Sequence, residues 1–258
     1  MSFPETALFA AAVTDHRFWL AVAIAILSGL VRGFSGFGSA LIYMPLVAAV
    51  YEPRTAAVTL LLIDTFGTTP FTLRSCARCT WREVLPIFIA AAVAVPFGAM
   101  ALKVVDPIWL RWFMVVLVLS LLVVLVSGWR YHSRPSLPVT VGVGLFSGFG
   151  GGAVQIAGPA VILYWLSTAN KAITVRDNLL VYYLLLDWML CAVYLVQGLI
   201  STELLALSIL LAPAFFLATW TGARLFHGAS DLLYRRIAYG IIAAAALVSI
   251  PGIEHLFR

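Results

Sequence analysis

The sequence predicts an all-α polytopic membrane protein built from two inverted repeats of about five membrane segments each, with broken or half helices at glycine motifs. Three observations lead to this fold class. The chain has 258 residues, of which 63% are hydrophobic and only 10% charged, which leaves too little polar surface for a soluble domain. Apolar runs of membrane-spanning length recur along it. The pentapeptide FSGFG at residues 34–38 returns unchanged at residues 146–150, each time between apolar runs.

Ten apolar segments are expected. Residues 84–102, 109–129 and 204–223 each form a run of about 20 residues with few charges, enough to span about 30 Å as a helix. Residues 1–17 form an N-terminal segment that precedes the first apolar segment. It lacks the positively charged region of a secretory signal. The first transmembrane repeat covers residues 18–130, with segments at 18–34, 38–50, 55–73, 84–102 and 109–129. The second covers residues 137–251, with segments at 138–147, 150–166, 177–198, 204–223 and 233–250.

Two of these segments, 38–50 and 138–147, are too short to cross a bilayer comfortably, and both adjoin a glycine break. We therefore expect each break to join two segments that enter the membrane and return. In that arrangement the loops on one side of the membrane carry ten Lys and Arg residues and those on the other side five. A kinked single crossing at each break would divide them almost evenly. The positive-inside rule favours the reversing arrangement, with the basic loops in the cytoplasm and both termini outside.

Further matches extend the repeat beyond the glycine breaks. The offset between matching positions grows from 112 to 124 residues along the chain, as a few insertions in the second copy would cause. Each copy then has three full crossings, and this odd number makes the two copies inverted, which permits alternating access to a central site. The matching pairs are Pro45 with Pro159, Arg54 with Arg176, Asp64 with Asp187, Gly98 with Gly222, and Arg111 with Arg235.

Two spaced glycine motifs carry a resemblance to a known family. They are Gly29-x-x-x-Gly33-x-x-Gly36-x-Gly38 leading to Pro45, and Gly144-x-x-x-Gly148-x-Gly150-Gly151-Gly152 leading to Pro159. On these motifs the chain, over about residues 18–250, resembles the sulfite exporter TauE/SafE family, also called the toluenesulfonate uptake permease family. The resemblance implies a permease for sulfur-containing or organic anions such as sulfite, sulfoacetate or sulfonates. Ser39 and Ala40 stand where a glycine run is more typical, so we expect two unequal half-sites.

The two breaks predict an anion site from the residues alone. A helix is expected to begin at about Gly38 and at about Gly150, and the first N–H groups of a helix have no intrahelical partner and carry partial positive charge. Two such helix starts near the membrane midplane would bind an anion through backbone groups. Alternatively, the glycines only allow close helix packing, which Gly29 and Gly33 fit well. The candidate substrate-binding residues are Gly36, Phe37, Gly38, Ser39, Gly148, Gly150, Gly151 and Gly152, with Gln155 and Arg32.

Three charged residues and one amide lie within apolar sequence. Asp64 and Asp187 are each expected about 15 Å inside a helix, where a carboxyl needs a cavity or a partner. They are either proton-coupling sites or helix–helix hydrogen-bonding groups. Arg32 either contacts the substrate anion as a planar fork of donors or extends to the outer interface. Gln155 follows the second break by about one helical turn and is the best side-chain ligand for the anion.

The rest of the sequence argues against other classes of protein. Cys76 and Cys79 form a C-x-x-C with no second pair and no nearby His, which predicts reduced, unlinked thiols rather than a metal site. The four histidines lie at segment ends and the two deep acids are far apart in sequence, so we expect no enzyme and no cofactor. No basic patch outside the membrane-flanking loops predicts nucleic-acid binding.

We therefore predict a multi-pass protein of the cytoplasmic (inner) cell membrane whose partners are the lipid bilayer and a small-molecule anion substrate. Two deep carboxylates favour a secondary carrier coupled to protons. An anion channel or passive pore is the alternative, because half-helices also build channels. The sequence is compatible with a homo-oligomer, and it leaves open the transport direction, the coupling ion and the exact substrate.

Overall fold

A computed structural model of the chain describes residues 13–35, 38–127, 136–166 and 172–225, together with Phe9. Every regular element in this part is helical and no strand occurs there, so the predicted all-α class is confirmed. The predicted tenth segment, 233–250, lies outside the described residues, as do Gly36 and Phe37 of the first glycine break.

The helices follow one another with short connections. The first half forms α2 (His16–Ser35), α3 (Ser39–Val50), α4 (Pro53–Thr72), α5 (Trp81–Val104) and α6 (Pro107–Ser127), with a short 3₁₀ helix, η1 (Leu73–Ala77), between α4 and α5. The second half forms α7 (Leu137–Val154), α8 (Gly158–Leu166), α9 (Ala172–Val196) and α10 (Thr202–Leu225). Pro53, Pro107 and Pro138 stand in the first turns of α4, α6 and α7, where a missing N–H costs no hydrogen bond.

Five of these helices, α2, α5, α7, α9 and α10, are long and apolar enough to cross a membrane. α3, with 12 residues, is as short as predicted. α7 has 18 residues, so the prediction that segment 138–147 is too short to cross is wrong. Phe97 and Trp109 are 65% and 69% exposed, as expected for side chains that lipid covers. The chain is therefore a multi-pass membrane protein.

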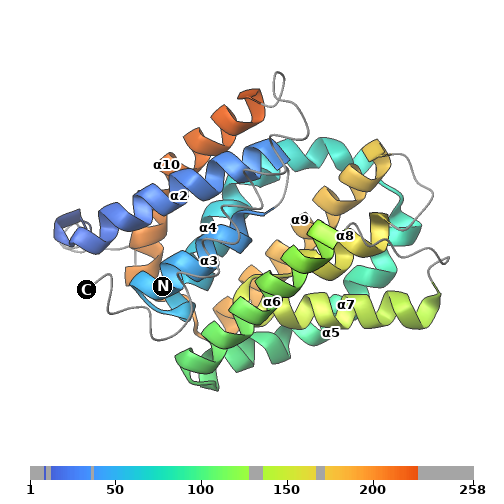
Figure 1. Cartoon of the computed structure of the whole chain (residues 1–258), viewed down its shortest axis with the longest axis horizontal. Helices are drawn as coiled ribbons and strands as arrows, with labels where there is room; N and C mark the ends of the chain where they lie inside the picture. The colour runs from blue at the N-terminus through green and yellow to red at the C-terminus, as the bar shows by residue number, and fades with distance from the viewer. Residues whose placement is uncertain (1–8, 10–12, 36–37, 128–135, 167–171, 226–258) are drawn as a thin grey trace.

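Two helix pairs hold the two halves of the chain together. α2 lies beside α10, and α5 lies beside α7 (Figure 1). At both contacts a glycine lets the backbones approach closely. A Cβ on Gly148 of α7 would overlap the backbone of Ala91 in α5, and a Cβ on Gly33 of α2 would overlap the carbonyl of Thr219 in α10. Small residues spaced four apart are the usual means by which membrane helices pack this closely.

The first chain break lies where the sequence predicts it, and the second does not. Gly38, with φ 94°, precedes α3, which begins at Ser39. α7 continues through the whole glycine run, and the chain breaks only at Gln155, with φ 57°, so that α8 begins at Gly158. The prediction of a helix start at about Gly150 is therefore wrong. α7 stays helical because its small-residue face packs along α5, and this contact outweighs the low helix propensity of glycine.

Candidate functional site

The two chain breaks open onto one cavity inside the helical bundle. It is lined by residues of α2, α3, α4, α7, α8 and α9, and it offers about 50 Å³ to the centres of water-sized molecules. One water needs about 10–15 Å³ by this measure, so the cavity has room for a small solute or a few waters. Its polar and glycine lining consists of Arg32, Gly38, Ser39, Asp64, Gly151, Gln155, Gly158, Tyr183 and Asp187.

Each break places the first turn of a helix at this cavity. Ser39 and Ala40 at the start of α3 line it, as does Gly158 at the start of α8. The first N–H groups of a helix have no intrahelical partner, and the helix dipole adds partial positive charge there. Gly38 and Gln155, both with positive φ, redirect the chain at the two breaks. The two helix starts together favour an anion in the space between them.

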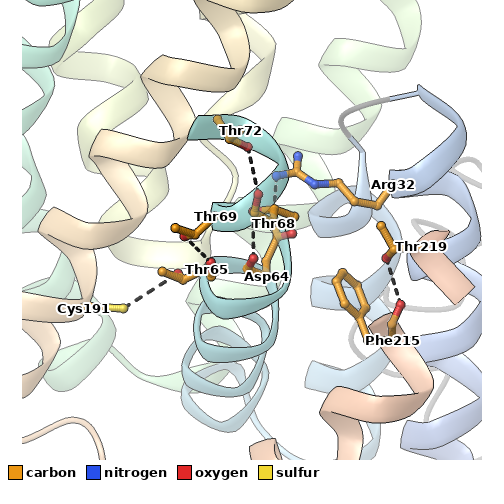
Figure 2. Close-up of polar contacts among 9 residues, drawn as sticks. All are labelled: Arg32, Asp64, Thr65, Thr68, Thr69, Thr72, Cys191, Phe215 and Thr219. Carbon is orange, nitrogen blue, oxygen red and sulfur yellow. Dashed lines mark hydrogen bonds and ion pairs between the residues drawn. The ribbon is translucent and has the colours of Figure 1, made fainter. Parts of the chain in front are cut away.

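A buried ion pair crosses this space. Arg32, in the last turn of α2, reaches α4 and places its Nη2 3.0 Å from Oδ2 of Asp64 (Figure 2). The two side chains are only 7% and 13% exposed. The other carboxylate oxygen of Asp64, Oδ1, is buried and has no hydrogen-bond partner among the residues that the structure describes. Within the described residues the pair is thus held through one oxygen only, and the other oxygen is left unsatisfied, which is unfavourable in a buried site.

The threonines around Asp64 do not supply the missing donor. Thr68 Oγ1 donates to the backbone carbonyl of Asp64 at 2.8 Å, and Thr72 Oγ1 donates to that of Thr68 at 3.0 Å. Thr69 Oγ1 donates to the carbonyl of Thr65 at 2.6 Å. Figure 2 shows these hydroxyls turned back along α4. Among the residues that the structure describes, Arg32 is therefore the polar partner of the Asp64 side chain.

A second carboxyl group lies in the same cavity. Asp187 of α9 lines it, and its charged neighbours are Asp64 and Arg32. Tyr183, one helical turn earlier on α9, has its ring centroid 5.6 Å from Cζ of Arg32, which is within the range of a cation–π contact. One guanidinium and two carboxyl groups, from three different helices, therefore share one small space.

The structure brings most of the predicted site residues together. Five of the predicted substrate-binding residues line the cavity beside both predicted acids. These five are Arg32, Gly38, Ser39, Gly151 and Gln155. The sequence left two positions open for the Arg32 side chain, at the substrate anion or at the outer interface. In the structure this side chain is buried at the cavity.

The other glycines of the second motif lie away from the lining. Gly148 and Gly152 face the backbone of α5, and Gly150 faces the carbonyl of Ile156 in the turn that follows α7. At these positions close packing accounts for the glycine. Gly36 and Phe37 belong to the undescribed residues.

Sequence reasoning missed two residues with defined roles. Tyr183 precedes Asp187 by four positions, and this helical spacing, which puts both on one face of α9, is the signal that could have found it. The second is Asn178, which follows Arg176 and Asp177 in the sequence as a helix cap would, but α9 begins already at Ala172, so Asn178 lies inside the helix. Its Oδ1 accepts the Thr80 N–H at 2.7 Å and its Nδ2 donates to Glu83 at 3.1 Å, so it ties α9 to the start of α5.

The C-x-x-C lies between α4 and α5, with Cys76 in η1 and Cys79 in the turn that follows it. Cys76 and Cys79 are free thiols, and Cys79 Sγ lies 3.6 Å from the carbonyl oxygen of Cys76. Burial raises the pKa of the Cys79 thiol, which lowers the fraction of reactive thiolate at neutral pH. Among the described residues, no group of three or more His, Cys, Asp or Glu side chains could hold a metal ion.

Comparison with known proteins gives one match. A family model described as "Sulfite exporter TauE/SafE" matches residues 21–249, nearly the whole chain. No match was found among the curated proteins or among the solved structures. The matched range contains all of the residues that line the cavity.

Proposed function

The chain belongs to the sulfite exporter TauE/SafE family, a family of membrane transporters, and we propose that it moves small sulfur-containing or organic anions across the cytoplasmic membrane through the cavity that α2, α3, α4, α7, α8 and α9 line. The substrates are sulfite, sulfoacetate or similar small sulfonates. Transport is that of a secondary carrier, coupled to protons at Asp64 and Asp187.

The observation that carries this proposal is the position of Arg32. Its side chain is 7% exposed and lines a cavity onto which two helix starts open. A buried guanidinium in an apolar protein requires an anionic partner; Asp64 fills that role in this structure, and a substrate anion can fill it in place of Asp64. Its planar fork of donors matches the oxygens of sulfite or a sulfonate group, and the helix starts supply further N–H groups for the same oxygens.

The size of the cavity favours small substrates. About 50 Å³ for the centres of water-sized molecules is a few times the space that one water needs. A three-oxygen sulfur group with a short substituent suits that space better than an aromatic sulfonate does. We therefore place sulfite and short alkanesulfonates ahead of toluenesulfonate as substrates.

The two carboxyl groups support proton coupling. When both Asp64 and Asp187 are ionised, they outnumber Arg32, the one basic residue in the described lining of the cavity, so an entering anion meets net negative charge. In a site of low dielectric constant this repulsion is strong, and protonation of the carboxyl groups removes it. Uptake of protons together with the anion follows from this arrangement.

The packing of the two halves supports alternating access by inverted repeats. The internal match pairs Asp64 of α4 with Asp187 of α9, and Gly98 of α5 with Gly222 of α10. Under this match, the α2–α10 pair corresponds to the α7–α5 pair, and both are closely packed through glycine. α4 and α9, which also correspond, contact each other and each brings one acid to the cavity. A site shared between two such halves is the arrangement that lets one half rock against the other.

The test is a flux measurement in proteoliposomes with sulfite and short alkanesulfonates under imposed proton gradients. The proposal predicts accumulation against the anion's own gradient when a pH gradient is present, and none when the gradient is collapsed. Saturable flux that ignores the pH gradient and only equilibrates the anion would identify a channel. Absence of any anion flux by the reconstituted, monodisperse protein contradicts the proposal.

A further inference from the structure

We propose that Asp64 is a built-in competitor of the transported anion for Arg32, so that an anion binds only after Asp64 takes up a proton. This inference rests on the proposed function and adds the means by which the proton and the anion are coupled. Asp64 occupies the guanidinium in the state that the structure shows, with Oδ2 3.0 Å from Nη2. A carboxylate and a sulfonate carry the same charge and use the same kind of oxygen, so both compete for one cation.

The geometry of the ion pair suits an Asp64 carboxylate that separates from Arg32 when a substrate anion binds. The Asp64–Arg32 contact is made through one carboxylate oxygen. Arg–carboxylate pairs frequently form two parallel hydrogen bonds instead. The free oxygen, Oδ1, is buried and has no hydrogen-bond partner within the described part of the chain. A proton can bind there without first breaking the hydrogen bond from Arg32. The neutral carboxylic acid then holds the guanidinium much less strongly, because the charge attraction is lost.

The charges balance in this exchange. One proton neutralises Asp64, one monovalent anion takes its place beside Arg32, and the net charge of the cavity is unchanged. Transport of a monovalent anion with one proton is then electroneutral. A divalent anion requires a second proton, and Asp187 in the same cavity is the group that can take it up.

The groups around Asp64 leave few other candidates for this titration. Arg32 comes from α2, and Asp187 and Tyr183 come from α9. Also on α9, Cys191 Sγ donates to Thr65 Oγ1 at 3.7 Å, and Tyr182 hydrogen-bonds Ser147 at 2.7 Å. On α3, Tyr43 hydrogen-bonds Thr59 at 2.9 Å. The ionisable side chains of α5, α6 and α10 stand near their helix ends, and α7 has none; they are Arg82, Glu83, Lys103, Arg111, Glu203 and Arg224.

The experiment measures binding of methanesulfonate, whose charge is constant over the range used, to the purified full chain between about pH 5.5 and 8.5. Wild type is expected to bind most tightly at low pH, with affinity falling about tenfold per pH unit once Asp64 ionises. Asp64→Asn is expected to bind tightly with little dependence on pH, because the competitor is gone. Asp106→Asn is the matched control: it makes the same substitution at an exposed acid outside the cavity, keeps the Asp64–Arg32 pair, and is expected to keep the slope.

The outcomes separate the two proposals. If wild type binds methanesulfonate equally at every pH, or if Asp64→Asn keeps the wild-type slope, the competition is refuted while anion binding stands. If wild type binds neither methanesulfonate nor sulfite at any pH, the proposed function fails as well. The pH dependence of wild type needs no variant, so the inference remains testable even if Asp64→Asn does not fold.

Discussion

Gly38 and Gln155 adopt the same left-handed backbone conformation, with φ 94° and 57°, and each stands at a chain break that opens onto the same cavity. Glycine adopts this conformation at no steric cost, whereas the Cβ atom of glutamine comes too close to the following carbonyl oxygen. The second break therefore keeps a side chain at the cavity that the first break lacks, and its Nε2 lies 3.3 Å from the hydroxyl of Tyr194. A non-glycine residue in a strained conformation at a cavity is expected to have a functional reason.

Replacing Gln155 separates its backbone from its side chain. Gln155→Gly and Gln155→Ala both remove the amide, but only glycine relieves the left-handed strain. We expect both variants to bind anion more weakly than wild type, and the Gly variant to be more stable than the Ala variant by about 1 kcal/mol. Thermal unfolding and methanesulfonate binding in detergent measure the two effects. Unchanged binding in both folded variants would exclude Gln155 as a ligand.

The α5–α7 contact predicts opposite effects for two glycines of one helix. A Cβ on Gly148 overlaps the backbone of Ala91, whereas a Cβ on Gly142 meets nothing within 4 Å in the described part of the chain. Gly148→Ala is expected to destabilise the protein by about 1–3 kcal/mol, and Gly142→Ala to stabilise it by about 0.5–1 kcal/mol. Melting temperatures of the two variants provide the check. Equal stability of both variants is incompatible with the close packing of α7 on α5.

Two polar contacts near the start of α5 are expected to contribute different amounts to the stability of the protein. Asn178 is fully buried and satisfies the N–H of Thr80, so Asn178→Leu leaves that donor unpaired and should cost about 1–3 kcal/mol. Arg78 pairs with Asp177 at 3.4 Å but is 61% exposed. Solvent screens that pair, so Arg78→Ala should cost less than about 1 kcal/mol. Unfolding measurements in detergent compare the stability of the two variants. A larger loss of stability in Arg78→Ala than in Asn178→Leu would contradict this prediction.

The polar residues of the site could be predicted from sequence better than the geometry of the second break. Arg32, Asp64, Asp187 and Gln155 stand out because charged and amide groups are rare in apolar runs, and the structure gathers all four at one cavity. The position of the second break could not be read locally, because a run of glycines predicts a broken helix unless a neighbour packs on it. α5 is that neighbour, and it lies about 50 positions away in sequence.

The partners of Asn178 show the same limit. Glu83 and Thr80 lie 95 and 98 positions away from it in sequence. A capping rule considers only the residues next to a helix start, so it assigns Asn178 to its own helix. The repeat pattern, by contrast, is long-range information that the sequence does contain, and it pairs the two acids that line the cavity.

Proton coupling predicts that each acid is needed for accumulation and not for folding. Asp64→Asn and Asp187→Asn keep the size of the side chain and remove its titration. We expect both purified variants to remain monodisperse, to exchange sulfite across the membrane at equal concentrations, and to lose accumulation of divalent sulfite driven by a pH gradient, because that anion needs a proton on each acid. Counterflow and gradient-driven uptake in proteoliposomes measure the two activities. Full accumulation by both variants would show that protons are coupled elsewhere or not at all.

The central claim is that the anion binds at Arg32, and the most direct measurement compares methanesulfonate binding to Asp64→Asn with binding to the double variant Arg32→Gln, Asp64→Asn. The double variant removes both members of the ion pair, so no unpaired buried charge is left to unfold the protein. We predict that the single variant binds methanesulfonate and that the folded double variant binds it at least about tenfold more weakly, because a charge-assisted pair in a buried site is lost. Equal affinity of the two folded variants would contradict the account and place the anion site elsewhere.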